Sequence, residues 1–381
     1  MVLGEPEAPR ATGSFKKDLA RWTVIPAHAR RLRVALLERW SRIEEEVERF
    51  PYNRLERRST GLAVIASGIA YGYVVDALDY LELRKEVTVL KIASTIPPPR
   101  RLMLDVLSSH GDVLVVEELE PIVEDWAKKL AYEERLDTRI RGKDLVNRAG
   151  ELTLETVARA IASFAGREYP WVPLRHEVKV PVPPRPPTLC PGCPHRALFY
   201  ALKRAVNRTR TKPIYSGDIG CYSLGVLPPF EMQDTLVEMG GSVGLANGFA
   251  HVDSEKTPIA IIGDSTFFHA GVPGLINAVY NKSPMLVVVL DNRVTAMTGH
   301  QPHPGTGFYA TGEPAPMIKV EDIARGVGIQ HVSTVDPFDL KETEKALVDA
   351  LRYVRSTGKP ALVVARRACT LLIDAMARRR G

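Results

Sequence analysis

Residues 258–292 constrain the fold most, because one helix-like run lies between two strand-like runs. Residues 258–262 and 285–290 are short, apolar and rich in β-branched side chains, as buried strands are. Residues 271–281 carry apolar side chains at helical spacing. The pattern predicts a βαβ unit, in which a helix joins two parallel strands of one sheet.

Each predicted strand is followed by a side chain that suits a hard cation, Asp264 after the first and Asn292 after the second. A right-handed crossover delivers the ends of both strands to the same edge of the sheet. Mg²⁺ takes oxygen ligands in octahedral geometry and keeps phosphate oxygens and water among them. The sequence therefore predicts a magnesium site at this edge. Capping of a helix N-terminus is the alternative for both side chains.

The same alternation predicts two α/β domains with mostly parallel, doubly wound sheets. Expected strands lie at residues 62–66, 87–92, 113–116, 214–215, 330–335 and 361–365, and expected helices at residues 71–81 and 101–109. A proline-rich stretch divides the chain. The predicted organisation is an arm with an amphipathic helix (1–58), a small α/β domain (59–170), a linker (171–188) and a second α/β domain (189–381).

The N-terminal segment combines a loose arm, residues 1–10, with an amphipathic helix over residues 31–50. Its apolar stripe consists of Leu36, Trp40, Ile43, Val47 and Phe50. The charged face is mixed in sign, which disfavours a membrane surface. We therefore expect the stripe to pack on the neighbouring domain.

Composition excludes several classes of protein. The 381 residues are 45% hydrophobic and 25% charged, as in ordinary globular proteins, and no signal peptide or spanning segment is visible, which favours the cytoplasm. The formal charge of +6 is modest and concentrated in residues 367–380, with no nucleic-acid-binding motif beside it. A solvated basic surface, or one that docks an acidic protein, is therefore favoured over a nucleic-acid site.

Glu117 and Glu118 follow the third predicted strand of the first domain. Two adjacent carboxylates suit acid–base catalysis. Acidic residues are also favoured at the start of a helix, where they interact with its dipole. The second interpretation is preferred here.

The cysteines form a pair two residues apart with two distant members: Cys190, Cys193, Cys221 and Cys369. Four thiolates in this pattern hold an iron–sulfur cluster or a tetrahedral zinc ion, and spacing alone does not choose between them. Four reduced, partly buried thiols are the third alternative.

Histidines offer further candidates. His195 follows the cysteine pair and His269 follows Asp264, so either is placed to move a proton or to hold a substrate carboxylate. A structural role is the alternative for each. His300 and His303 invite a zinc interpretation, but the glycine and prolines around them favour a loop over the active site.

Several motifs together carry a family resemblance. The segment from Gly263 to Asn292 resembles the Gly-Asp-Gly and Asn-Asn motif of thiamine diphosphate (TPP) enzymes, with Ser265 and Asp291 as departures. Both departures are similar to the 2-oxoacid:ferredoxin oxidoreductases. CPGCPHRALFYAL, SGDIGCYSLG, EMGGSVGLANGF and DNRVTAMTGHQPHPGTG resemble the α subunits of indolepyruvate ferredoxin oxidoreductases. The resemblance covers nearly the whole chain.

This resemblance implies a transketolase C-terminal-like domain followed by a TPP-binding domain. The residues implied to bind the cofactor are Gly240, Gly241, Ser242, Gly263, Asp264, Ser265, Asn292 and Thr295, with backbone N–H groups of the glycine turn expected to face an anion. Asp264, Asn292 and the backbone carbonyl of Val294 are the implied Mg²⁺ ligands. The four cysteines are the implied ligands of a [4Fe-4S] cluster.

The implied activity is the coenzyme A-dependent oxidative decarboxylation of aryl 2-oxoacids, with electrons passing to ferredoxin. In the family, the α subunit also has a pyrimidine-binding domain, which supplies the glutamate that activates TPP, and a ferredoxin-like domain. Neither has a counterpart here, so we expect inactivity without a second oxidoreductase subunit and a chain that supplies the pyrimidine-binding domain. A TPP-dependent decarboxylase without redox function and a non-catalytic cofactor-binding remnant are the alternatives.

Overall fold

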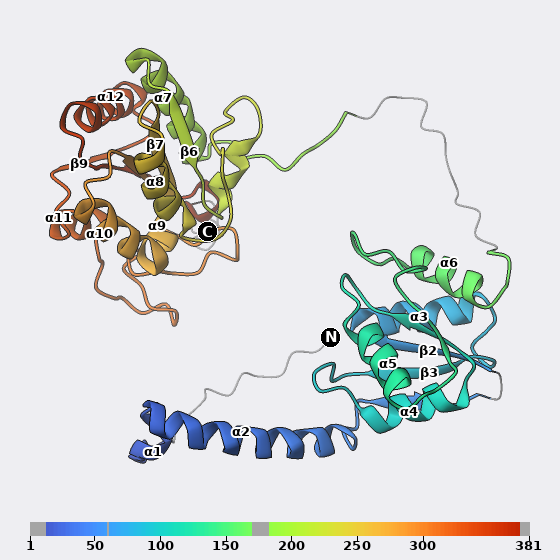
Figure 1. The fold of residues 1–381 in the computed structure, drawn as a ribbon. Helices are drawn as coiled ribbons and strands as arrows, with labels where there is room; N and C mark the ends of the chain where they lie inside the picture. Colours follow the sequence, from blue (N-terminus) through green and yellow to red (C-terminus); the bar gives the residue numbers. More distant parts are fainter. Residues whose placement is uncertain (1–12, 59–60, 170–182, 374–381) are drawn as a thin grey trace. The chain divides into compact units, whose positions relative to one another are not determined.

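The computed structural model describes residues 13–58, 61–169 and 183–373. These residues form two compact units, one on each side of residues 170–182 (Figure 1). The expected N-terminal arm and most of the expected linker lie outside the described residues. Among the described helices, none is both long and apolar enough to cross a membrane.

The first unit is a five-stranded sheet with the strand order β1-β3-β2-β4-β5, covered by helices on both faces (Figure 1). The sheet is parallel except for its edge strand β1, which runs antiparallel to β3. Helices α3 and α6 pack on one face, and α4 and α5 on the other. The elements are β1 (Arg54–Glu56), β2 (Leu62–Ser67), α3 (Ile69–Tyr80), β3 (Thr88–Ile92), α4 (Arg100–Ser109), β4 (Asp112–Val116), α5 (Ile122–Glu133), β5 (Arg139–Arg141) and α6 (Leu154–Phe164).

Glu117 stabilises the start of helix α5. Its two carboxylate oxygens accept hydrogen bonds from the backbone N–H groups of Val123 (2.8 Å) and Glu124 (2.9 Å), which lie in the first turn. Burial raises the pKa of Glu117, although these N–H groups favour the ionised form. The helix-start interpretation of this acidic pair is therefore confirmed for Glu117, whereas Glu118 is exposed.

Helix α2 (Pro26–Val47) precedes the first sheet and follows the short helix α1 (Leu19–Trp22). It begins five residues earlier than expected, with a proline in its first turn, where a missing N–H costs nothing. Of the apolar stripe only Val47 is buried, while Leu36, Trp40 and Ile43 are exposed. The expectation that the whole stripe packs on a domain is thus wrong; packing is confined to the end of the helix.

The second unit is a parallel five-stranded sheet with the order β6-β7-β8-β10-β9. Helices α7 and α12 cover one face, and α8, α10 and α11 the other. Its strands are β6 (Pro213–Ser216), β7 (Thr257–Gly263), β8 (Leu286–Asp291), β9 (His331–Val335) and β10 (Ala361–Arg366). Its main helices are α7 (Pro194–Thr209), α8 (Gly241–Val252), α10 (Val272–Tyr280), α11 (Val320–Gly326) and α12 (Leu340–Thr357). All five strands were expected from the sequence.

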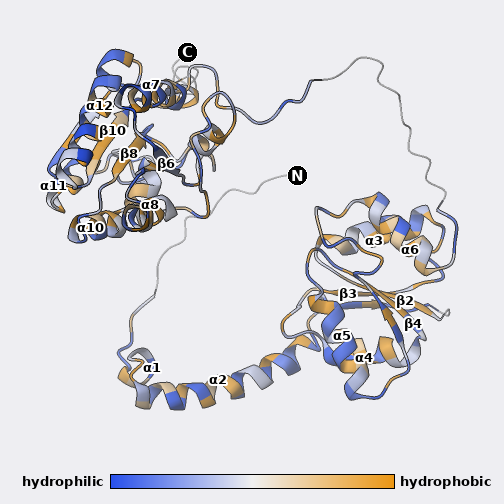
Figure 2. Ribbon diagram, turned by 45° about the horizontal axis from the view of Figure 1, so that its top comes forward, coloured by the Kyte–Doolittle hydropathy of each residue, from blue (hydrophilic) through white to orange (hydrophobic). Residues whose placement is uncertain are grey.

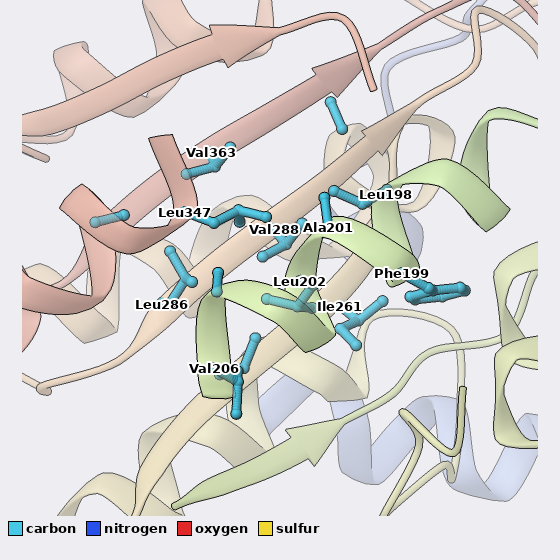
Figure 3. Close-up of a cluster of buried hydrophobic side chains, with 14 of the residues drawn as sticks. Leu198, Phe199, Ala201, Leu202, Val206, Ile261, Leu286, Val288, Leu347 and Val363 are labelled. Carbon is cyan, nitrogen blue, oxygen red and sulfur yellow. The ribbon is translucent and has the colours of Figure 1, made fainter. Parts of the chain in front are cut away.

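The core of this unit explains the apolar runs. β7 and β8 are buried on both faces, so neither strand alternates apolar and polar residues. On one face Leu198 and Leu202 of α7 and Leu347 of α12 surround Val288 and Ile261 (Figure 3). Each fully buried side chain of this size stabilises the fold by about 1.5–3 kcal/mol.

The predicted βαβ unit is present, and one detail differs. Residues 264–271, expected as a connection, are helical from their first residue: α9 (Asp264–Thr266) continues into a single π-helical turn (Phe267–Gly271) and then into α10. π-turns of this kind are frequent at functional sites. Asp264 is therefore held between the end of β7 and the start of a helix.

Candidate functional site

A cavity opens at the carboxyl edge of the second sheet. The registers of β7, β8 and β10 place Gly263 beside Leu290 and Asp291 beside Arg366, so the strands end together. Residues expected at the cofactor site line this cavity: Gly263, Asp264, Ser265, Asn292, Val294, Thr295 and His195. The sequence prediction that Asp264 and Asn292 meet at one edge is confirmed.

The Asp264 carboxylate is buried and held by backbone donors. Oδ1 accepts from the Ser265 N–H (2.8 Å), and Oδ2 accepts from the Arg293 N–H (2.8 Å). Each oxygen retains lone-pair capacity for another ligand. Gly263, not Asp264, occupies the N-cap position of α9, and the cap makes no side-chain hydrogen bond. Helix capping therefore does not explain Asp264.

Asn292 is oriented by two neighbours. Its amide Nδ2 lies 3.4 Å from Nε2 of His195, and its Oδ1 accepts from the Val294 N–H at 3.3 Å. An amide nitrogen only donates, so Nε2 of His195 is the acceptor and the neutral ring carries its proton on Nδ1. A carboxylate and an oriented amide at the ends of adjacent strands are a donor set that fits Mg²⁺.

His303 contacts Asp264 directly, which sequence reasoning did not find. Its Nε2 lies 3.0 Å from Oδ2 of Asp264 but makes no well-directed hydrogen bond. Its Nδ1 accepts from the Gly305 N–H at 3.1 Å, and its ring lies beside Phe268. The expected loop over the site is present, since residues 293–319 contain no helix or strand. No spacing in the sequence indicates that this loop reaches Asp264.

Asp291, one of the two departures from the TPP motif, belongs to a separate ionic group. Its Oδ2 accepts from Nε of Arg366 (2.6 Å), and Arg366 also binds both oxygens of Glu321 (2.9 and 2.7 Å). Burial and the nearby Asp264 raise the pKa of Asp291. The Arg366 guanidinium lowers the pKa of Glu321 to about 2. Arg366 thus balances the negative charge of Asp291, which does not line the Asp264 cavity.

The Gly240–Ser242 turn is held by Asp218, another residue that the sequence did not single out. Both oxygens of Asp218 accept from the Gly240 N–H (2.8 and 2.9 Å), and Oδ2 accepts from the Ser242 hydroxyl (2.9 Å). Burial raises the pKa of Asp218. Gly240, Gly241 and Ser242 do not line the Asp264 cavity. Contact between this turn and a cofactor stays a prediction.

Tyr222, in the 3-10 helix Cys221–Val226, explains two glycines of the motifs. A Cβ added at Gly263 would lie 2.6 Å from the tyrosine ring, and one added at Gly220 would lie 2.4 Å from it. The Tyr222 hydroxyl donates to the Ile219 carbonyl (3.2 Å), and burial raises its pKa. Both glycines are therefore required by close packing on one aromatic ring.

The four cysteines line a second cavity of the same unit, beside the first. Burial raises the pKa of Cys193 to about 11 and also raises the pKa of Cys221. The Cys369 N–H donates to the Asn292 carbonyl (3.0 Å), and the Thr370 hydroxyl donates to the Gly192 carbonyl (2.7 Å). The structure thus brings Cys190 and Cys193, from the start of the predicted domain, and Cys369, from near its end, to one cavity. A shared set of ligands needs this proximity.

The arrangement of the thiols bears on which group they suit. Within the described residues, no three His, Cys, Asp or Glu side chains are arranged to hold a single metal ion. A zinc ion with Zn–S bonds of about 2.3 Å would need its sulfurs within about 4 Å of one another. Four thiols that line one cavity are a donor set of the kind that holds an iron–sulfur cluster or a zinc ion.

The two cavities share His195, Cys221, Asn292 and Ala296. His195 lies in the first turn of α7, two residues after Cys193, and burial lowers its pKa to about 4. Its ring packs edge-on against Tyr222. The neutral imidazole of His195 therefore lies between the four cysteines and Asp264.

The remaining candidate histidines lie elsewhere. His269 is exposed on the π-helical turn and lines neither cavity, so the geometry gives its predicted catalytic role no support. His300 is exposed and lines the cysteine cavity, where its backbone N–H donates to the Thr295 carbonyl (3.0 Å).

A family model matches the second unit. Residues 218–365 match the family described as "Thiamine pyrophosphate enzyme, C-terminal TPP binding domain". The matched span contains Asp264, Asn292 and Cys221, while Cys190, Cys193 and Cys369 lie outside it. The match includes the sheet edge at which the Asp264 cavity lies, so the second unit is similar to TPP-binding domains.

Curated relatives match all or part of the chain. "Indolepyruvate oxidoreductase subunit IorA" of Thermococcus kodakarensis is 42% identical over 405 residues, covering 100% of this chain and 61% of that protein. The subunit of the same name from Archaeoglobus fulgidus is 41% identical, covering 94% of this chain and 56% of that protein. "2-oxoglutarate synthase subunit KorB" of Archaeoglobus fulgidus is 27% identical, covering 44% of this chain and 66% of that protein. The chain spans about three fifths of the length of the IorA relatives.

Proposed function

The chain belongs to the family of the indolepyruvate oxidoreductase subunits IorA, and from this premise we propose that it is a catalytic subunit of an arylpyruvate:ferredoxin oxidoreductase. The proposed reaction is the oxidative decarboxylation of an aryl 2-oxoacid, with transfer of the acyl group to coenzyme A and of electrons to ferredoxin. One observation carries the redox part: the cysteine cavity and the Asp264 cavity share His195 and Asn292.

Asp264 and Asn292 are the residues that would hold Mg²⁺ and, through it, the diphosphate of TPP, with the Val294 carbonyl as a further ligand. The Ser265 and Arg293 N–H groups fix the Asp264 carboxylate, and His195 fixes the Asn292 amide. A site prepared in this way loses little entropy when the ion binds. When bound, TPP supplies the carbanion chemistry at the keto carbon of the substrate.

Cys190, Cys193, Cys221 and Cys369 would hold a [4Fe-4S] cluster that accepts electrons beside the cofactor. The raised pKa of Cys193 means that the free thiol is protonated at neutral pH. Assembly must therefore release protons from the site. Leu189, Leu224 and Leu371 also line this cavity, and an apolar surround limits access of water to a bound group.

Partner chains complete the proposed enzyme. A chain with a pyrimidine-binding domain would supply the activating glutamate, and a second oxidoreductase subunit would complete the complex, in the cytoplasm. The proposal therefore concerns the assembled complex.

The test measures iron, acid-labile sulfide and bound TPP on the anaerobically purified complex of this chain with its partner subunits. We expect about four irons per chain, lost in Cys193→Ser, and TPP–Mg²⁺ binding that is lost in Asp264→Asn. His300→Ala, which changes the cysteine cavity without removing a thiol, is the matched control and should retain the iron. Wild-type protein without iron, but with bound TPP, would overturn the redox assignment. Protein that binds neither would overturn the proposed function.

A further inference from the structure

Helix α2 carries an exposed apolar stripe along its length. Ala29, Leu32, Leu36, Trp40, Ile43 and Val47 follow one another at steps of three or four, which places them on one side of a helix. The exposed fractions of Leu36, Trp40 and Ile43 are 41%, 38% and 44%. Figure 2 shows hydrophobic residues recurring along α2 between hydrophilic ones. Val34 and Leu37, on other sides of the helix, are exposed as well (57% and 50%). Contiguous exposed apolar residues such as those of the stripe mark interaction sites.

The charges of α2 are segregated along the helix. The N-terminal half carries His28, Arg30, Arg31 and Arg33 and no acidic residue, whereas the last turn carries Glu44, Glu45 and Glu46; Glu38, Arg39 and Arg42 lie between them. The first turn contains no acidic residue and the last turn no basic one. This order opposes the helix dipole, which favours acids at the N-terminus and bases at the C-terminus. The charge order therefore does not serve the stability of the isolated helix.

We infer that α2 docks antiparallel on α2 of a second copy of this chain. In that arrangement the basic half of each helix lies along the acidic half of the other, and the two apolar stripes face each other. The contact is two-fold symmetric, so each favourable pair occurs twice. A parallel arrangement would instead place like charges together at both ends.

The positions of individual side chains suit this arrangement. At 100° per residue, Arg33 and Glu44 lie on the same side of the stripe. With the two-fold axis near Arg39, Arg33 of one copy approaches Glu44 of the other, and Leu36 approaches Trp40. On the other flank of the stripe, Arg39 of one copy would approach Arg39 of the other copy, and this single contact is repulsive. Two reciprocal Arg33–Glu44 pairs and the apolar seam oppose that single contact.

The surface beside the acidic half has room for a partner. A cavity of about 580 Å³ lies between the end of α2 and helices α4 and α5. Glu44, Glu45, Glu48 and Glu133 line it together with Arg100, Arg101 and Lys129, so its charge is mixed. The partner's basic half, which follows the exposed Trp22, Val24 and Ile25, would lie beside Glu44 and Glu45 on the α2 side of this cavity. An anionic membrane is the less suitable occupant, because the acidic half would be repelled from it.

The experiment measures the mass of the full chain by light scattering as a function of protein concentration and salt. We expect a dimer of the 42.1 kDa chain that weakens with added salt. Arg33→Glu and Glu44→Arg, tested separately, should each weaken dimerisation by about tenfold, because two attractive pairs become repulsive. Arg42→Glu, with the same change in charge on the face away from the stripe, should dimerise like the wild type.

Mixing the two defective variants provides the decisive result. An Arg33→Glu chain facing a Glu44→Arg chain regains both charge pairs in the antiparallel arrangement, so the mixture should dimerise. The single variants exclude the parallel arrangement, because there each substitution would exchange one like-charge contact for another and leave dimerisation unchanged. Circular dichroism verifies that each variant retains its helix content. A wild-type monomer, whether or not it binds phosphatidylcholine–phosphatidylserine vesicles, would overturn the inference. Failure of the mixture to dimerise would overturn the antiparallel pairing.

Discussion

Nε2 of His303 lies 3.0 Å from Oδ2 of Asp264, and both side chains are buried. The Gly305 N–H donates to Nδ1 of the same ring, so in the neutral imidazole Nε2 carries the proton, although Nε2 makes no well-directed hydrogen bond to the carboxylate. His303 is thus a positioning residue for Asp264: it limits the rotation of a carboxylate that the backbone holds at both oxygens.

Replacement of His303 by alanine should weaken the binding of TPP in the presence of Mg²⁺ by about tenfold, as losses of residues behind a metal ligand commonly do. Isothermal titration calorimetry measures the effect. His300→Ala, on the same loop but without contact to Asp264, is the control and should bind as the wild type does. Equal affinity in His303→Ala and the wild type would remove the positioning role.

Gly240→Ala should destabilise the second unit by about 2–4 kcal/mol. The residue has φ = +95°, and a Cβ there would lie 2.3 Å from Cβ of Ala270. Gly244→Ala, within helix α8 and with no atom near the added Cβ, should be neutral or stabilise by up to about 1 kcal/mol. Denaturant unfolding of the two variants tests the difference, and similar stabilities would contradict it.

Arg366→Ala should cost about 2–4 kcal/mol, since it leaves Asp291 and Glu321 without their shared cation. The neighbouring Arg367→Ala should cost about 1 kcal/mol or less, because Arg367 pairs with Asp336 at the exposed surface. Differential scanning calorimetry of both variants makes the comparison. An Arg366→Ala protein as stable as Arg367→Ala would show that the ionic group does not stabilise the fold.

The Glu321–Arg366 pair should contribute less to the free energy of unfolding at acidic pH. The Arg366 guanidinium holds the pKa of Glu321 at about 2, below its ordinary value of 4.5. A carboxyl whose pKa falls on folding stabilises the protein above its unfolded pKa, and this contribution is lost as the pH falls from 4.5 towards 2. Asp291 acts in the opposite direction, because burial raises its pKa. Urea unfolding at pH 7, 4.5 and 3 should therefore show a smaller loss between pH 4.5 and 3 for Glu321→Gln than for the wild type.

The sheets were predictable because strands buried on both faces leave continuous β-branched runs. Residues 258–262 and 285–290 mark β7 and β8 to within about a residue at each end. The meeting of Asp264 and Asn292 followed from the crossover rule alone. The edge strands β1 and β5 were both missed, because three residues with partial burial carry no readable pattern.

The missed residues of the site depend on contacts between distant segments. Asp218 holds a turn 22 residues later, and His303 reaches Asp264 through a loop without regular structure. Arg366 meets Asp291 only because β10 inserts between β8 and β9. Strand order and loop paths arise from packing of the whole unit, so no local pattern encodes them.

The position of the four cysteines in the chain sets an order of events during synthesis. Cys190 and Cys193 are made first, and Cys369 follows only after every strand of the second sheet has been translated. Cys369 is held in place by the end of β8 through the Asn292 carbonyl. A group bound by all four thiols can therefore enter only a nearly finished unit, and a ribosome stalled before residue 369 would display an incomplete set of ligands.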